Sequence, residues 1–126
     1  MKIIFLEKTL SSLSKESSSG NIEYKRKILK INEKILDKRA TQMLYRSIEG
    51  DGKAYYYVGV DDDGSTQGIS SHELIITLEN LEKISKLVGL NIQKATIYKG
   101  KKYGNYIAIL EIYKKHSTII DTYSFI

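Results

Sequence analysis

The sequence contains no cysteine, no proline and no tryptophan, and its apolar runs are short. Without cysteine, the chain has neither a disulfide nor a thiolate zinc site, which fits a reducing compartment such as the cytoplasm. The apolar run at residues 3–6 is shorter than the ~7–15 residues of a signal-peptide core, and no run approaches the ~18–20 residues of a membrane span. We therefore expect a cytoplasmic protein with no membrane association.

The 126 residues are sufficient for one domain, and a hydrophobic fraction of 41% is adequate for its core. The formal net charge of +5 favours a polyanionic partner, because attraction to phosphates grows with the number of lysine and arginine side chains presented. Ten tyrosines add stacking capacity for nucleic-acid bases. A solubilising surface charge explains the same balance, so charge alone does not decide between these interpretations.

The segment at residues 54–69 has the pattern of a β-hairpin. Residues 54–60 alternate with the period of two that is typical of a strand, and an Asp-Asp-Asp-Gly turn follows. A second short strand, ending near Ile69, is expected to pair with the first. Gly59 has no side chain, so another backbone or a ligand can approach the first strand beside Asp61.

Two helices are expected. Asn32 is a suitable N-cap for a helix over residues 33–49, with Gly50 in the left-handed conformation at its end. Ser70 and Glu73 form a capping box that begins a second helix. The expected buried stripe is Leu36, Ala40, Met43, Leu44 and Ile48 in the first helix, and Leu74, Leu78, Leu81, Ile84 and Val88 in the second.

Further strands are expected at residues 3–6, 21–29, 92–99 and 106–113. The strand at residues 21–29 would place Glu23, Lys25 and Lys27 together on a solvated face. The order of these elements predicts an α+β fold, with a mixed β-sheet of about five to six strands and two α-helices packed on one face.

Composition divides the chain into three segments. Residues 1–19 are expected to form an N-terminal strand and a flexible serine-rich linker, and residues 20–116 the α+β domain. Residues 117–126 form a C-terminal tail, whose apolar side chains predict docking on the domain.

Several separated stretches resemble one known family. GNIEYKRKI at residues 20–28, TQMLYRSIEGDGKAYYYVGVDDDGSTQGI at residues 41–69 and LENLEKISKLVGLNI at residues 78–92 resemble the N-terminal domain of the GTP-binding protein one and two family of translational GTPases. More distantly, IEYK, GVDDDG and GI resemble the AlbA-like fold of Schlafen proteins. The chain has no G-x-x-x-x-G-K-S/T loop to cradle nucleotide phosphates, so it is not itself a GTPase. We expect either a stand-alone relative or an isolated N-terminal domain.

The Schlafen resemblance implies a metal-dependent endoribonuclease as an alternative function. The acidic trio of those ribonucleases maps onto Glu23 and Asp61, but the remaining Glu falls at Ser18, and Glu16 lies two residues out of register. Two carboxylates would hold Mg²⁺ or Mn²⁺ weakly, with Lys25 near the phosphate. Without nuclease activity, no cofactor is expected.

The leading hypothesis is a non-catalytic RNA-binding module associated with translation or RNA surveillance, as the GTPase resemblance implies. Its partner would be tRNA, rRNA, mRNA or the ribosome. The expected phosphate-binding residues are Lys25, Arg26, Lys27, Lys30, Lys101 and Lys102, with Tyr103 and either Tyr55 or Tyr57 as stacking residues.

Two other interpretations stay open. The turn at residues 99–105, which carries Lys101, Lys102 and Tyr103, is equally well interpreted as an ordinary solvated lysine-rich turn. The chain is also interpretable as a protein-interaction or homodimerisation domain, with the consecutive tyrosines and the apolar tail as the interface.

Overall fold

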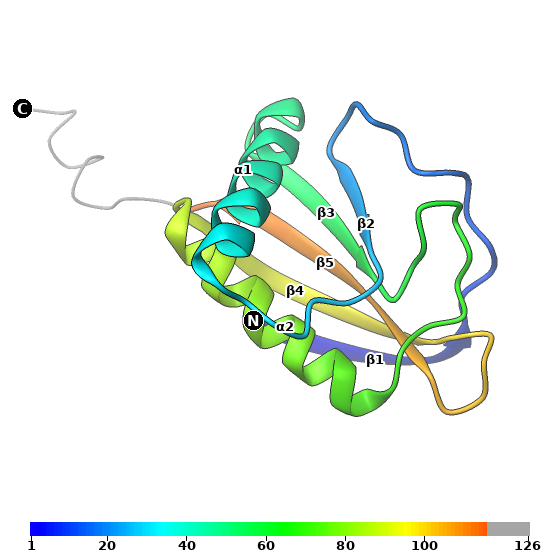
Figure 1. The fold of residues 1–126 in the computed structure, drawn as a ribbon. Helices are drawn as coiled ribbons and strands as arrows, with labels where there is room; N and C mark the ends of the chain where they lie inside the picture. Colours follow the sequence, from blue (N-terminus) through cyan, green and yellow to red (C-terminus); the bar gives the residue numbers. More distant parts are fainter. Residues whose placement is uncertain (116–126) are drawn as a thin grey trace, which may run out of the picture.

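Five strands form one sheet in the order β1-β4-β5-β3-β2, and both helices cover the same face of it (Figure 1). The computed structural model describes residues 1–115, so the predicted C-terminal tail lies outside the described residues. The elements are β1 (Lys2–Thr9), β2 (Ile22–Lys25), α1 (Glu33–Glu49), β3 (Lys53–Val58), α2 (Ser71–Leu87), β4 (Leu90–Lys99) and β5 (Tyr106–Lys114). The predicted α+β fold is confirmed.

The sheet is mixed because each edge strand runs parallel to its neighbour. β1 pairs with β4 and β2 pairs with β3 in parallel, whereas β5 is antiparallel to both β3 and β4. The apolar run near the N-terminus is therefore an edge strand, as expected. Neither described helix is long and apolar enough to cross a membrane.

The predicted hairpin at residues 54–69 is wrong. Both edges of β3 are already occupied, by β2 on one side and by β5 on the other, so no edge is left for the following segment. That segment instead reaches the start of β5, where Ile69 and Tyr106 form an isolated antiparallel bridge. The expected close approach at Gly59 is confirmed: a Cβ there would lie 2.9 Å from the carbonyl oxygen of Tyr106.

The helices begin where the capping residues predict. The Asn32 side chain accepts from the backbone N–H of Ile35 at 2.9 Å, and Ser70 and Glu73 form the complete capping box of α2. The expected left-handed Gly50 is wrong, because its φ is −102°, and Asp51 with φ 54° makes the turn instead.

The predicted stripe of α1 is confirmed for Leu36, Ala40 and Met43, which contact the core, and wrong for its last two residues. Leu44 and Ile48 are 41% and 69% exposed, whereas Met43, Arg46 and Ser47 are buried. Leu44 and Ile48 instead line a groove with Asp51 and Val88. In α2, the predicted Leu74, Leu81 and Ile84 are buried, and Leu78 and Val88 pack partly buried against the same core.

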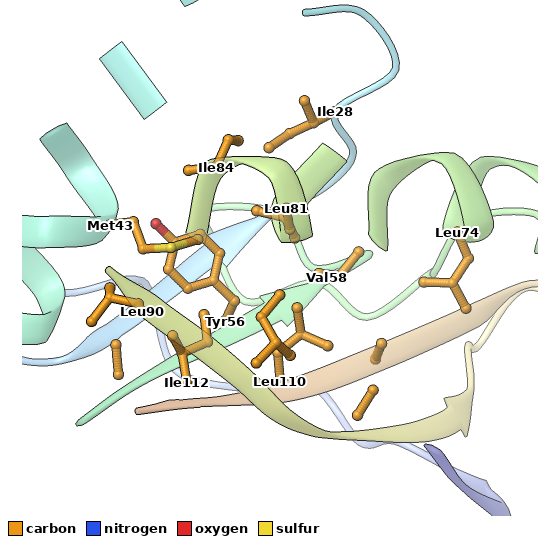
Figure 2. Packing of buried hydrophobic residues seen from close by; sticks show 14 of the residues in the cluster. Ile28, Met43, Tyr56, Val58, Leu74, Leu81, Ile84, Leu90, Leu110 and Ile112 are labelled. Atoms are coloured by element: carbon orange, nitrogen blue, oxygen red, sulfur yellow. The ribbon is translucent and has the colours of Figure 1, made fainter. Parts of the chain in front are cut away.

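The main core lies between the helices and the sheet. Met43 of α1, together with Leu81 and Ile84 of α2, faces Tyr56 on β3 and Leu110 on β5 (Figure 2). All five side chains are almost fully buried. A smaller cluster on the opposite face joins Tyr24, Val60 and Ile107 to part-buried residues of the segment that follows β1.

The serine-rich segment after β1 has no regular secondary structure, but it is fastened to the rest of the chain. The N–H of Leu13 donates to Gly64 O at 2.9 Å, and the N–H of Glu16 donates to Asp62 O at 2.8 Å. The guanidinium of Arg46 donates to the carbonyl groups of Ser17, Ser19 and Gly20. These bonds correct the expectation of a flexible linker, whereas the predicted domain boundaries stay predictions.

Candidate nucleic-acid interface

One end of the sheet carries both groups of predicted phosphate-binding residues. Lys25 pairs with Val58 where β2 and β3 finish, and Lys99 pairs with Tyr106 where β4 finishes and β5 begins. We call this the basic end (at the lower right in Figure 1). β3 and β5 lie between β2 and β4, so at a strand spacing of about 4.8 Å these two strands are about 14 Å apart.

The β4–β5 turn at the basic end is held in place by the segment before α2. The N–H groups of Lys101 and Lys102 donate to the carbonyls of Thr66 and Gln67, at 2.9 and 3.2 Å. The side-chain amide of Asn105 donates to Gly68 O at 3.0 Å. These bonds fasten the turn to the segment before α2.

The side chains of this turn face solvent. Tyr103 is fully exposed, and Lys101 and Lys102 are exposed as well. Within residues 1–115, no carboxylate forms an ion pair with Lys101 or Lys102, although the ammonium of Lys101 contacts the hydroxyl of Ser12. The turn therefore presents positive charge that no described carboxylate neutralises.

The second group, at the end of β2, is partly neutralised by acidic neighbours. Arg26 lies 3.5 Å from Asp61, and the Lys27 ammonium lies 2.7 Å from the Glu73 carboxylate. These partly exposed pairs are weak, so a phosphate can compete for their cations. Lys30 is five residues beyond β2, on the segment that Ile28 bonds to Thr77 and Asn80 of α2, so it does not belong to this group. It is exposed and has no ion pair among the described residues.

Glu23 is not on a solvated face, and that expectation is wrong. Its side chain is 2% exposed, with the Arg46 Nε at 2.9 Å and the Lys25 Nζ at 3.2 Å. The parallel pairing of β2 with β3 places Glu23 beneath α1, where Arg46 projects toward it. Lys25 is only 14% exposed for the same reason, so its charge serves this buried pair.

Glu16 joins this buried group although the sequence register placed it elsewhere. Its carboxylate accepts from the backbone N–H of Tyr24 and lies 4.0 Å from Arg46. Burial raises the pKa of the Glu16 carboxyl, the Tyr24 N–H lowers that pKa, and the charge of Glu23 raises it. The Arg46 guanidinium lies beside both carboxylates, where a metal ion bound to them would have to lie.

Asp61 is directed to a different partner. It pairs with Arg26 at the surface, while Glu23 pairs with Arg46 and Lys25 inside. Among residues 1–115, no three His, Asp or Glu side chains form a group that could hold a metal ion. The carboxylates of the nuclease alternative are therefore engaged by basic side chains in this structure.

Tyr55 and Tyr57 of β3 lie on the sheet face opposite to the helices, whereas Tyr56 faces the helices in the main core. The Lys53 ammonium lies 4.9 Å from the ring centres of both Tyr55 and Tyr113, and Tyr57 packs 5.6 Å from Tyr24. Tyr55, Tyr57 and Tyr113 are partly exposed. Tyr55 and Tyr113 lie toward the opposite end of the strands from the turn, whereas Tyr57 pairs with Ile109 near the basic end. The proposal that Tyr55 or Tyr57 stacks on a base stays a prediction.

Sequence reasoning missed two residues that the structure places in these sites. Arg46 appears in the sequence only as a basic residue of an amphipathic helix, and Phe5 as part of a short apolar run. The only signal for Arg46 is its position three residues after Met43, on the same side of the helix, where an apolar residue would be expected. No local signal marks Phe5, because its neighbours come from β5 and the β4–β5 turn.

Comparison with known proteins relates part of the chain to a larger protein. The chain is 36% identical over 80 residues to GTP-binding protein 2 of Mus musculus and of Homo sapiens, which covers 64% of this chain and 13% of that protein. It is 35% identical over 78 residues to uncharacterized protein R625 of Acanthamoeba polyphaga mimivirus, covering 61% of this chain and 42% of that protein. No protein-family model and no solved structure matches significantly.

The chain therefore has partial homology to GTP-binding protein 2 and spans a small fraction of its length. This agrees with the resemblance to the GTP-binding protein family. The likeness to Schlafen proteins stays a prediction.

Proposed function

We propose that the chain is a non-catalytic RNA-binding module associated with translation or RNA surveillance. The observation that supports it most is the basic end of the sheet. Lys101 and Lys102 project there from a fastened turn, and the exposed Arg26 directly follows the end of β2. Exposed cations on two neighbouring projections suit a phosphate backbone that passes across the end of the sheet.

The link to translation rests on the partial homology to GTP-binding protein 2 and on the family resemblance. The aligned part is about one eighth of that protein, so we transfer no GTP-dependent activity. The partner of such a module would be tRNA, rRNA, mRNA or the ribosome.

The test is binding of labelled tRNA and rRNA fragments by the purified chain at low salt, in EDTA. We expect retention that weakens steeply as salt increases, and that Lys101→Glu/Lys102→Glu abolishes. The matched control is Lys83→Glu/Lys86→Glu, which changes two exposed lysines near the C-terminal end of α2 at the opposite end of the sheet. Binding that both double variants weaken equally would indicate general charge attraction and contradict an interface at the basic end.

The same mixtures with Mn²⁺ test for cleavage. Metal-dependent cleavage that is lost in both Glu23→Gln and Asp61→Asn would replace the proposal with the nuclease alternative. Absence of both binding and cleavage would contradict the proposal and favour a protein-interaction domain, whose apolar interface is insensitive to salt.

A further inference from the structure

A groove of about 530 Å³ opens between β1 and the β4–β5 turn. Phe5 lies on one side, Tyr103 and Tyr106 line the turn side, and the rim carries Lys99, Lys101 and Asn105. Its volume is within the range of sites that hold small organic groups.

Phe5 is the unusual residue of this groove. It is 54% exposed although it belongs to a strand of the sheet, and its ring meets Tyr106 edge-on at 5.7 Å with the planes 70° apart. An edge-on contact leaves the faces of one ring available, and a planar base can stack on an aromatic face regardless of its sequence.

Positive charge surrounds this ring. The Lys99 ammonium lies 3.5 Å from the Glu7 carboxylate, but Glu7 is 83% exposed, so the pair is weak and a phosphate can displace the carboxylate. Lys101 adds a second cation at the rim.

The groove is also preorganised. A Cβ at Gly100 would lie 2.3 Å from the carbonyl oxygen of Gln67, so the turn backbone packs directly on the segment before α2. The N–H of Gly100 donates to Asn105 O at 2.9 Å and closes the turn. A fixed groove loses little conformational entropy when it binds a ligand.

We propose that this groove binds an unpaired RNA base, stacked on Phe5, with the neighbouring phosphates on Lys99 and Lys101. The inference rests on the proposed RNA-binding function and narrows it to single-stranded segments, because a paired base cannot leave its helix to enter the groove without a cost. The lysines favour RNA over an apolar protein segment as the occupant.

The test compares fluorescent twelve-nucleotide single strands with a duplex of the same length, bound to the whole chain. Phe5→Ala is expected to weaken single-strand binding roughly tenfold and to leave the weak duplex binding unchanged. Ile3→Ala is the matched control: Ile3 is on the same face of β1 two residues away, is 61% exposed and does not line the groove. Phe5→Tyr should retain most of the affinity because it keeps the ring.

The outcomes separate the two proposals. If the native chain binds no RNA while it is folded by circular dichroism, the proposed function itself fails. If it binds RNA and Phe5→Ala has the same affinity as the native chain, the groove is not the base site and only this inference fails.

A third outcome concerns β1 as an interaction edge. If Phe5→Ala and Ile3→Ala both lower the molar mass of an oligomer in solution and neither changes RNA affinity, the exposed side chains of β1 form an interface with a second copy of the chain. That result would also overturn the base-binding groove.

Discussion

At the scale of single residues, the Arg46 guanidinium holds together parts of the chain that are far apart in sequence. It binds Glu23 of β2 at 2.9 Å and the carbonyl groups of Ser17, Ser19 and Gly20. A buried arginine needs such partners, because an uncompensated buried charge is costly. The same contacts explain why the serine-rich segment is fixed in place.

We therefore predict that Arg46→Ala lowers the free energy of unfolding by about 3–5 kcal/mol, since it leaves the buried Glu23 carboxylate without its main partner. Urea denaturation followed by circular dichroism measures the change. Lys27→Ala, which breaks the more exposed pair with Glu73, is the control and should have a much smaller effect. A double replacement, Arg46→Met/Glu23→Leu, should recover part of the loss. If Arg46→Ala and Lys27→Ala lowered the free energy of unfolding equally, the buried Arg46–Glu23 pair would matter no more than an exposed one, and the prediction would be contradicted.

Two carboxyl groups should titrate in opposite directions from their usual pKa. Burial raises the pKa of Glu16 above 4.5, whereas the Lys27 ammonium holds the pKa of Glu73 below 4.5. The stability that Glu16 contributes is therefore present below pH 4.5 and lost as pH rises through its raised pKa. The contribution of Glu73 is present above pH 4.5 and lost as pH falls through its lowered pKa.

Carboxyl carbon NMR titration of the folded chain reads both pKa values directly. In stability measurements, Glu16→Gln should gain stability relative to the native chain as pH rises above 4.5, whereas Glu73→Gln should lose stability relative to it as pH rises toward 4.5. If the stability of both variants changed in the same direction with pH, the environment described for Glu16 or for Glu73 would be contradicted.

At the scale of elements, the path of the chain out of β3 depends on Gly59. Its φ of +86° is in the left-handed region, and a Cβ would lie 2.9 Å from Tyr106 O and 3.4 Å from the Cα of Gly68. This close backbone contact sets where the segment before α2 meets the β4–β5 turn, and so it positions the basic end.

Gly59→Ala should consequently destabilise the fold more than Gly104→Ala. Both glycines have positive φ, which costs about 1–2 kcal/mol for alanine, but a Cβ at Gly104 meets no atom within 4 Å. The additional cost at Gly59 comes from displacing the β5 backbone. Thermal unfolding of the two variants measures the difference, and equal melting temperatures would mean that the contact at Gly59 relaxes freely.

At the scale of the whole molecule, the net charge of +5 is less informative than its distribution. Arg46 and Lys25 are used inside the fold, and Arg26 and Lys27 are partly compensated by Asp61 and Glu73. The turn lysines, in contrast, pair with no carboxylate among the described residues.

The salt dependence of RNA binding should reflect this distribution. Each lost phosphate contact reduces the slope of log K against log salt by about 0.7 for a single strand, so Lys101→Ala/Lys102→Ala should reduce it by about 1.4. Lys83→Ala/Lys86→Ala should leave the slope unchanged. Titrations with a single-stranded RNA at several salt concentrations give both slopes, and an unchanged slope in the turn variant would remove these lysines from the interface.

The sequence by itself determined the elements whose signals are local. Asn32 and the Ser70–Glu73 box set the helix starts because capping uses side chains and N–H groups within three residues. The alternation of apolar residues likewise located β3, β4 and β5, since each of these strands buries one face on the helices.

Only the tertiary structure decided the pairing of the strands and the partners of the charges. An alternating pattern predicts a strand but does not indicate which strand will pair with it. The turn after β3 therefore predicts a hairpin, which the structure excludes because β2 and β5 occupy both edges of β3. Glu23 has the same local pattern whether it faces water or Arg46, and the parallel β2–β3 pair beneath α1 decides between them. Phe5 and the turn lysines, separated by more than ninety residues, meet only because β1 lies beside β4.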